Sequence, residues 1–169
     1  MADFKLTYAT MFNPPEELHT GFDKAVEKLK KNLGREYGML INGKEVKADD
    51  KYDDLSPVNT DWVLAKMQKG NAKHAQEAMA AARKAFPGWS HTPWQKRVEL
   101  LRKAASLIEE RIFDLGAAMA LEVGKNRMES LGDVQETADL MYFSAQMMEE
   151  NDGFIKPMGK DPLVGYDAT

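Results

Sequence analysis

The chain has 169 residues, of which 43% are hydrophobic, and a formal net charge of −4 at pH 7. This composition is near the globular average, so it predicts a packed core and excludes wholesale disorder. Acidic and basic residues are interspersed without a basic stripe, which argues against a nucleic-acid partner. No uncharged apolar run reaches the ~18 residues of a membrane helix, and the first twenty residues lack a secretory apolar core. We therefore expect a cytoplasmic protein without a membrane partner.

The amino-terminal third predicts a tail, a helix and a β-hairpin. Residues 1–15 show no periodicity, which is typical of a tail or surface arm. A helix is expected over 16–33 with Gly34 at its end, so the segment is 16–34. Its apolar face consists of Phe22, Val26, Leu29 and Leu33. Asn42-Gly43 between two short runs with β-forming residues predicts a hairpin, because both turn positions require a positive φ. The extended region 38–69 includes a turn at Pro57 and a strand near Val63.

Residues 71–150 predict a series of helices. Asn71 is expected to cap the first helix, and Pro87-Gly88 to end it. The apolar face of that helix is Ala75, Ala78, Met79, Ala82 and Phe86. Thr92 and Gln95 have the spacing of a capping box with proline at the first helical position. The helix that follows is expected to bury Val98, Leu101, Ala105 and Ile108.

The remaining pattern predicts two more helices. After a break near Arg111, residues 112–123 are apolar around most of the circumference, which favours full burial. Gly124 is expected to end that helix. A last helix over 127–150 has one apolar face, made of Leu131, Val134, Ala138, Met141, Ala145 and Met148. The pattern then fades, so 151–169 is expected to be an extended tail. The fold class is mainly α with a small β-hairpin element (α+β).

Candidate chemical groups are few. The chain has no cysteine, which excludes disulfides and thiolate metal sites. The three histidines, at positions 19, 74 and 91, have no second histidine at helical spacing, so no metal site is expected. No glycine-rich phosphate motif is present. The last helix carries an acidic row of Glu129, Asp133 and Glu136, followed by Asp139. This row is either the solvated side of an amphipathic helix or a cation-binding row, although no Glu-x-x-His pair supports a di-metal bundle.

Three sequence blocks occur in an order that is informative together. The first is L-I-N-G-K at 40–44 with S-P-V-N at 56–59. The second is A-M-A-A-A-R-K-A-F-P-G-W at 78–89, followed by Arg97 and Leu100-Leu101. The third is E-V-G-K at 122–125, followed by D-V-Q-E at 133–136. Over roughly residues 38–150 the chain resembles the amino-terminal part of NAD(P)-dependent aldehyde dehydrogenases. The helix before the hairpin makes it most similar to 1-pyrroline-5-carboxylate dehydrogenases.

The resemblance implies an enzyme that oxidises glutamate semialdehyde to glutamate with NAD, in proline catabolism. In that family a cysteine thiolate attacks the aldehyde, an Asn and a backbone N–H hold the oxyanion, and a Glu activates water. All these groups lie later in the family's sequence, so no catalytic or cofactor-binding residue is assigned in this chain. The resemblance places Glu136 near the mouth of the aldehyde site, which makes it a substrate-entrance candidate.

The same resemblance predicts how the chain behaves. Residues 1–169 would be a single incomplete domain, the helical segment of the α/β cofactor-binding domain, and inactive alone. Its partner would be the remainder of the polypeptide, and the intact enzyme a homo-oligomer. An isolated fragment is expected to self-associate or be marginally stable, because uncovered apolar surface favours any partner that hides it. Another aldehyde dehydrogenase subfamily and a free-standing helical binding module are the alternatives.

Overall fold

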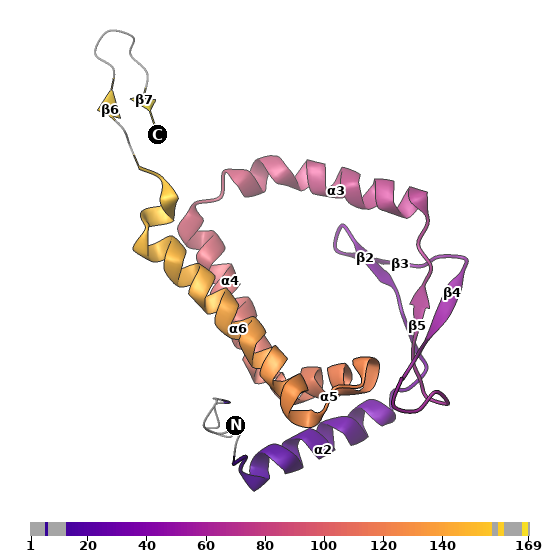
Figure 1. Cartoon of the computed structure of the whole chain (residues 1–169). Helices are drawn as coiled ribbons and strands as arrows, with labels where there is room; N and C mark the ends of the chain where they lie inside the picture. Colours follow the sequence, from indigo (N-terminus) through magenta and orange to yellow (C-terminus); the bar gives the residue numbers. More distant parts are fainter. Residues whose placement is uncertain (1–5, 7–12, 157–158, 161–166, 169) are drawn as a thin grey trace.

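The computed structural model describes residues 6, 13–156, 159–160 and 167–168, so most of the expected tail at 1–15 lies outside the described residues. Among these residues, helices dominate (Figure 1). The helices are α2 (Glu16–Lys30), α3 (Ala72–Ser90), α4 (Trp94–Glu110), α5 (Ile112–Val123) and α6 (Arg127–Glu150). The strands are β1 (Arg35–Tyr37), β2 (Met39–Ile41), β3 (Lys44–Val46), β4 (Lys51–Leu55) and β5 (Val63–Gln68). The expected fold class, mainly α with small β elements, is confirmed.

The carboxyl-terminal segment begins with a short 3-10 helix, η1 (Asp152–Phe154). Two short strands follow, β6 (Gly159–Lys160) and β7 (Asp167–Ala168), and they pair in antiparallel fashion. The expected extended tail therefore starts with a helical turn, and part of it lies outside the described residues.

The hairpin forms where its turn residues predict it. β2 and β3 pair in antiparallel register, with Ile41 opposite Lys44. Asn42 and Gly43 have φ values of 53° and 72°, the positive values that a two-residue turn of this type needs. The turn chemistry of these two residues therefore predicts both the place and the register of the hairpin.

A second sheet has the strand order β1-β5-β4. β4 and β5 are antiparallel, and the expected turn at Pro57 lies between them, whereas β1 runs parallel to β5. The sequence does not predict β1, because three residues are too few to show a periodicity. The helix expected over 16–33 ends earlier, at Lys30. Gly34 adopts a φ of 73° in the turn before β1, and its N–H donates to the carbonyl of Val63 at 2.7 Å.

The helical core is built on an antiparallel pair, α4 and α6 (Figure 1). Small residues permit close packing, because Ala105, Ala138 and Ala145 are all fully buried. At one end of this pair α5 packs against α6, and α2 packs against α5. A cluster of buried side chains joins these elements: Leu6, Leu18, Phe22, Ala25, Ala117, Ala120 and Leu131. Leu6 belongs to the expected surface tail, yet only 4% of it is exposed, so this residue is part of the core.

Two expectations about helix ends are wrong. α3 continues through Pro87 to Ser90, and two carbonyls near its end accept hydrogen bonds from side-chain hydroxyls. Ser90 Oγ donates to the carbonyl of Pro87 at 3.1 Å, and Thr92 Oγ1 donates to that of Gly88 at 3.0 Å. The hydroxyl of Thr92 thus completes α3 and makes no capping bond for α4, whose N-cap is Pro93.

α5 is also less buried than its sequence predicts. Gly116, Ala117, Ala120 and Leu121 are buried, whereas Leu115 and Val123 are 39% and 57% exposed. Gly124 ends α5 in the left-handed conformation, as predicted. One side of this apolar helix therefore lacks a cover within the described residues.

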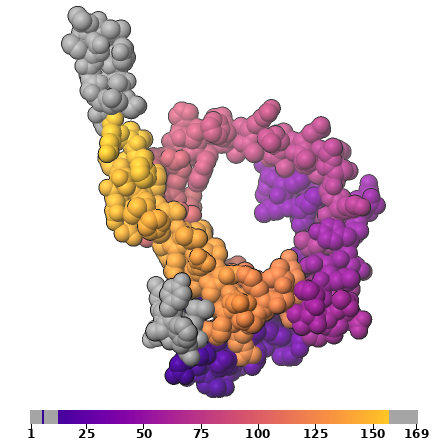
Figure 2. Space-filling model, viewed as in Figure 1, coloured from indigo at the N-terminus to yellow at the C-terminus, as the bar shows by residue number. Residues whose placement is uncertain are grey.

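The described elements surround an open centre. The space-filling view shows a ring with an opening through it, bordered by α3 on one side and by α5 and α6 on another (Figure 2). A compact domain of this length would fill its own centre with side chains.

Candidate functional site

The start of α6 places the acidic row next to Lys125. Gly124 turns the chain out of α5, and Asn126 caps α6 by accepting the N–H of Glu129 at 3.0 Å. The ammonium of Lys125 then donates to the carboxylate of Asp133. This hydrogen bond raises the pKa of Lys125, burial opposes the rise, and the charges of Asp133, Glu129 and Glu136 add to it. The three carboxylates therefore lie within electrostatic reach of one lysine.

The fourth acid of the row, Asp139, has a different environment. It accepts a hydrogen bond from Gln135 Nε2 at 3.1 Å, and the same amide donates to Glu109 of α4 at 3.1 Å. Tyr142 also donates to Glu109, at 3.0 Å. The pKa of Tyr142 is raised, first by burial and then by this carboxylate. Asp139 thus belongs to the polar seam between α4 and α6, separate from the acids around Lys125.

The described residues contain no group of three or more histidines and acids that is arranged to hold a metal ion. The histidines instead have structural partners. His19 Nδ1 lies 2.7 Å from Arg127 Nη1, and His74 Nδ1 accepts the N–H of Asn71 at 3.1 Å in the capping box of α3. His91 Nδ1 lies 2.7 Å from the carbonyl of Pro87, so this nitrogen must carry the proton.

Glu136 remains exposed on α6, one turn beyond Asp133. Among the described residues, no hydrogen bond or ion pair involves its carboxylate, whereas Asp133 is held by Lys125. Leu140 and Phe143 follow Glu136 at helical spacing and are 58% and 57% exposed. This side of α6 therefore presents a carboxylate beside an apolar strip, a combination that suits an amphipathic or cationic ligand.

Two of the informative sequence blocks meet in the structure. Ser56 is fully buried and its hydroxyl donates to the carbonyl of Leu121 at 2.5 Å, while accepting the N–H of Val58 at 3.3 Å. Pro57 packs near Gly124. The S-P-V-N turn thus holds the end of α5 and the E-V-G-K loop, and through that loop it fixes where α6 begins.

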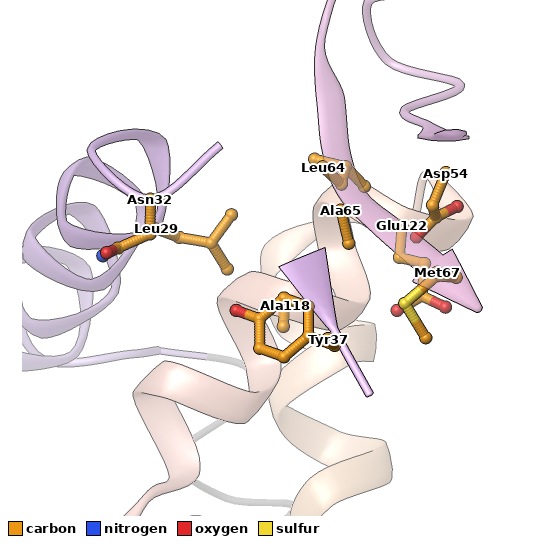
Figure 3. A pocket seen from close by; sticks show the side chains of 9 residues that line it. All are labelled: Leu29, Asn32, Tyr37, Asp54, Leu64, Ala65, Met67, Ala118 and Glu122. Atoms are coloured by element: carbon orange, nitrogen blue, oxygen red, sulfur yellow. The ribbon is translucent and has the colours of Figure 1, made fainter. Parts of the chain in front are cut away.

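A pocket of about 360 Å³ lies between α2, the three-stranded sheet and α5 (Figure 3). Its lining is largely apolar, with Asn32, Tyr37, Asp54 and Glu122 as the polar groups. Glu136 is not among the lining residues, so the pocket and the predicted entrance residue are separate. Asp54 and Glu122 come from elements far apart in sequence, so no spacing pattern could have indicated this pocket.

The sequence and the fold of this chain both match known proteins. The Aldehyde dehydrogenase family profile matches residues 45–167. The 1-pyrroline-5-carboxylate dehydrogenase of Geobacillus sp. (strain WCH70) is 34% identical over 133 residues, which are 78% of this chain and 26% of that protein. Two solved structures of Thermus 1-pyrroline-5-carboxylate dehydrogenase, each 28% identical, align with TM-scores of 0.83 and 0.81; the second contains bound NAD. They cover 96% and 98% of this chain, and the chain covers 32% and 31% of them.

Lactaldehyde dehydrogenase from Escherichia coli is a more distant neighbour, with a TM-score of 0.65, 29% identity and coverage of 69% of this chain and 24% of that protein. The chain belongs to the aldehyde dehydrogenase family. It spans about a quarter of the length of the curated relatives it matches. None of the described helices is long and apolar enough to cross a membrane.

Proposed function

We propose that this chain is the amino-terminal part of an NAD-dependent aldehyde dehydrogenase that oxidises glutamate semialdehyde to glutamate. Glutamate semialdehyde is in equilibrium with its cyclic imine, 1-pyrroline-5-carboxylate, the compound after which the Geobacillus and Thermus relatives are named. NAD is the proposed cofactor because one of the Thermus structures contains it. This chain's share of the work is structural: it supports the domain that carries the chemistry and shapes the approach to it.

The observation that carries the proposal is the shared helix α2. The family profile begins at residue 45, after α2. The Thermus structure covers 96% of the 169 residues, which leaves about seven unmatched, whereas α2 alone has 15. The superposition must therefore include at least half of α2. Lactaldehyde dehydrogenase covers only 69% of the chain, so the larger shared portion favours the 1-pyrroline-5-carboxylate subfamily over that alternative.

The chemistry of the proposed reaction belongs to sequence outside this chain. The family nucleophile is a cysteine thiolate, and this chain contains no cysteine. Hydride acceptance by the nicotinamide would be supplied by NAD bound to the rest of the enzyme, and no residue of this chain is assigned to hold it. What the described residues contribute is the position of α6, which the loop of Gly124 and Lys125 and the buried hydroxyl of Ser56 fix.

Glu136 is proposed to lie at the entrance for the aldehyde. Its support is an exposed carboxylate that forms no hydrogen bond or ion pair with any residue the structure describes, on the side of α6 that also exposes Leu140 and Phe143. The substrate carries an α-ammonium group, so a negative charge at the entrance would attract that end. No proton-transfer role is proposed for this residue.

A chimaera tests the proposal. In it, this chain replaces the matched amino-terminal stretch of the Geobacillus enzyme. The chimaera is expected to form NADH from glutamate semialdehyde, whereas the purified chain alone is expected to form none. A folded chimaera without activity would overturn the assignment, and NADH formation by the chain alone would overturn its structural role.

A further inference from the structure

The carboxylate of Glu109, near the end of α4, joins two residues of α6 that are seven positions apart. Its Oε1 accepts a hydrogen bond from Gln135 Nε2 at 3.1 Å, and its Oε2 accepts one from the hydroxyl of Tyr142 at 3.0 Å. Burial and then this carboxylate raise the pKa of Tyr142, so the hydroxyl keeps its proton and acts as a donor at neutral pH. One side chain of α4 therefore bridges two turns of α6.

The amide of Gln135 is held from two directions. Besides its bond to Glu109, Nε2 donates to Asp139 of the same helix at 3.1 Å, so both hydrogens of the amide have acceptors. Only 7% of Gln135 is exposed. Buried polar groups that lose a partner are costly, so this side chain has strong reason to stay where it is. The bridge to Glu109 therefore has a fixed donor at its α6 end.

The rest of the contact between α4 and α6 is poor in features that would define a register. Its fully buried side chains include Ala105, Ala138 and Ala145. Alanine lets two helices approach closely, but a methyl group forms only a low ridge, so it opposes sliding and rotation weakly. Hydrogen bonds require a narrow range of distance and angle, and a polar group in a helix interface can fix the register for this reason. The two bonds to Glu109 supply the register that the alanines leave open.

The rotation of α6 determines where Glu136 points. Successive residues of an α-helix differ by about 100° in direction, so a fixed Gln135 also fixes its neighbour. Gln135 is buried toward Glu109 of α4, whereas Glu136 is exposed. A slip of one turn, about 5.4 Å, would separate both donors from Glu109 and move Glu136 by the same amount. The two glutamates are thus linked through the backbone of α6 without sharing a hydrogen bond.

We propose that Glu109 is a positioning residue for the aldehyde entrance: its bridge to Gln135 and Tyr142 sets the rotation and register of α6, and so the direction in which Glu136 presents its carboxylate. The inference rests on the proposed function and adds to it the residue that orients the entrance. Glu109 acts on the substrate through Glu136, so its loss should weaken substrate binding and leave the chemical step unchanged.

Kinetic coupling between the two glutamates tests the inference in the complete product of the gene that encodes this chain. Glu109→Leu removes both acceptors and should raise KM for glutamate semialdehyde roughly three- to ten-fold, with kcat within about two-fold of the parent. Glu109→Gln should restore a KM near that of the parent, because its carbonyl accepts from Gln135 and its amide donates to the hydroxyl oxygen of Tyr142. In a Glu136→Gln background, Glu109→Leu should raise KM no further, since the charge that it orients is gone.

Two further variants separate positioning from general stability. Arg102→Met removes the ion pair with Glu149, which joins the same two helices with N–O distances of 3.1 and 2.5 Å. This pair is partly exposed and lies farther along α6 from Glu136, so its loss should leave KM unchanged. Tyr142→Phe removes one of the two bonds to Glu109 and should raise KM in the same direction by a smaller factor. It provides the test if Glu109→Leu does not fold.

The outcomes distinguish this inference from the proposed function. A parent enzyme that forms no NADH from glutamate semialdehyde would overturn the proposed function itself. An active parent would overturn the positioning role alone in any of three cases. In the first, the folded bridge variants keep the parent KM. In the second, the effects of Glu109→Leu and Glu136→Gln on KM multiply in the double variant. In the third, Arg102→Met raises KM as much as Glu109→Leu does.

Discussion

The hydroxyl of Ser56 donates a 2.5 Å hydrogen bond to the carbonyl of Leu121, across 65 residues of sequence. Ser56 is fully buried, and the bond satisfies a carbonyl at the end of α5 that has no partner in the next turn. It joins the turn before β5 to the loop before α6. The position of α6 therefore depends on a residue in the β region.

Ser56→Ala tests this link. Removal of the hydroxyl leaves the Leu121 carbonyl buried without that donor, which should lower the free energy of unfolding by about 1–3 kcal/mol. Urea unfolding measures the change. Ser90→Ala is the control, because Ser90 also donates to a carbonyl but is exposed, and it should cost roughly 0.5 kcal/mol or less. Equal losses for the two variants would contradict the role given to Ser56.

Gly116 of α5 packs directly against Leu131 of α6. A Cβ atom at residue 116 would lie 2.7 Å from Leu131 Cδ2, and Leu131 is only 1% exposed. Gly116→Ala should therefore destabilise the chain by about 1–3 kcal/mol through overpacking, despite the better helix propensity of alanine.

Gly88→Ala is the matched comparison, since nothing lies within 4 Å of its would-be Cβ and its φ is not positive. There the propensity gain acts alone and should stabilise α3 by up to about 1 kcal/mol. Thermal unfolding followed by circular dichroism measures both variants. The contact would be refuted if the two alanines changed stability in the same direction.

Glu36 should make the sheet sensitive to acid. Its hydrogen bond with Lys51 is the main cause that lowers the pKa of Glu36 from 4.5 to about 2, against burial, with help from Gln68 and Lys47. Because the folded pKa lies below the ordinary value, this stabilisation is fully present above pH 4.5 and is lost as the pH falls toward 2. Carboxyl NMR titration measures the pKa, and Glu36→Gln should remove this part of the pH dependence. A midpoint for Glu36 near 4.5 would contradict the network.

The isolated chain should self-associate in a concentration-dependent manner. Its exposed apolar residues include Phe86, Val123, Leu140 and Phe143, each more than half exposed. Exposed apolar side chains of this kind favour any partner that hides them. Sedimentation equilibrium at several protein concentrations measures the association. A stable monomer at all of them would show that the exposed face needs no cover.

Glu136→Gln, introduced into the chimaera, tests the entrance residue. Loss of the negative charge should raise KM for glutamate semialdehyde several-fold, which corresponds to a loss of about 1 kcal/mol in substrate binding. The value of kcat should change little, because the proposed role is attraction of the substrate and not chemistry. Glu129→Gln on the same row provides the control and should leave both constants near those of the parent. A large fall in kcat with constant KM would instead assign Glu136 to the chemical step.

Local signals in the sequence predicted the local structure well. Asn42-Gly43 forms the expected turn, Asn71 caps α3, and Gly124 ends α5 with a φ of 73°. Each of these features depends on one or two residues and on backbone preferences that need no tertiary partner.

The errors had both local and tertiary sources. Pro87 did not end α3, and the hydroxyls of Ser90 and Thr92, three and four residues beyond their acceptors, donate to carbonyls of its last turn. The apolar circumference of α5 predicted full burial, yet Val123 is 57% exposed, which fits a surface that another part of the enzyme would cover. The Ser56–Leu121 bond had no signal at all, since neither residue type indicates a partner 65 positions away.

The most direct test of the central claim is a steady-state assay of the complete product of the gene that encodes this chain. NADH formation is measured with NAD and, in parallel, glutamate semialdehyde and lactaldehyde. We predict the higher kcat/KM for glutamate semialdehyde. A higher kcat/KM for lactaldehyde would assign the protein to another aldehyde dehydrogenase subfamily, and no NADH with either aldehyde would contradict the proposed function.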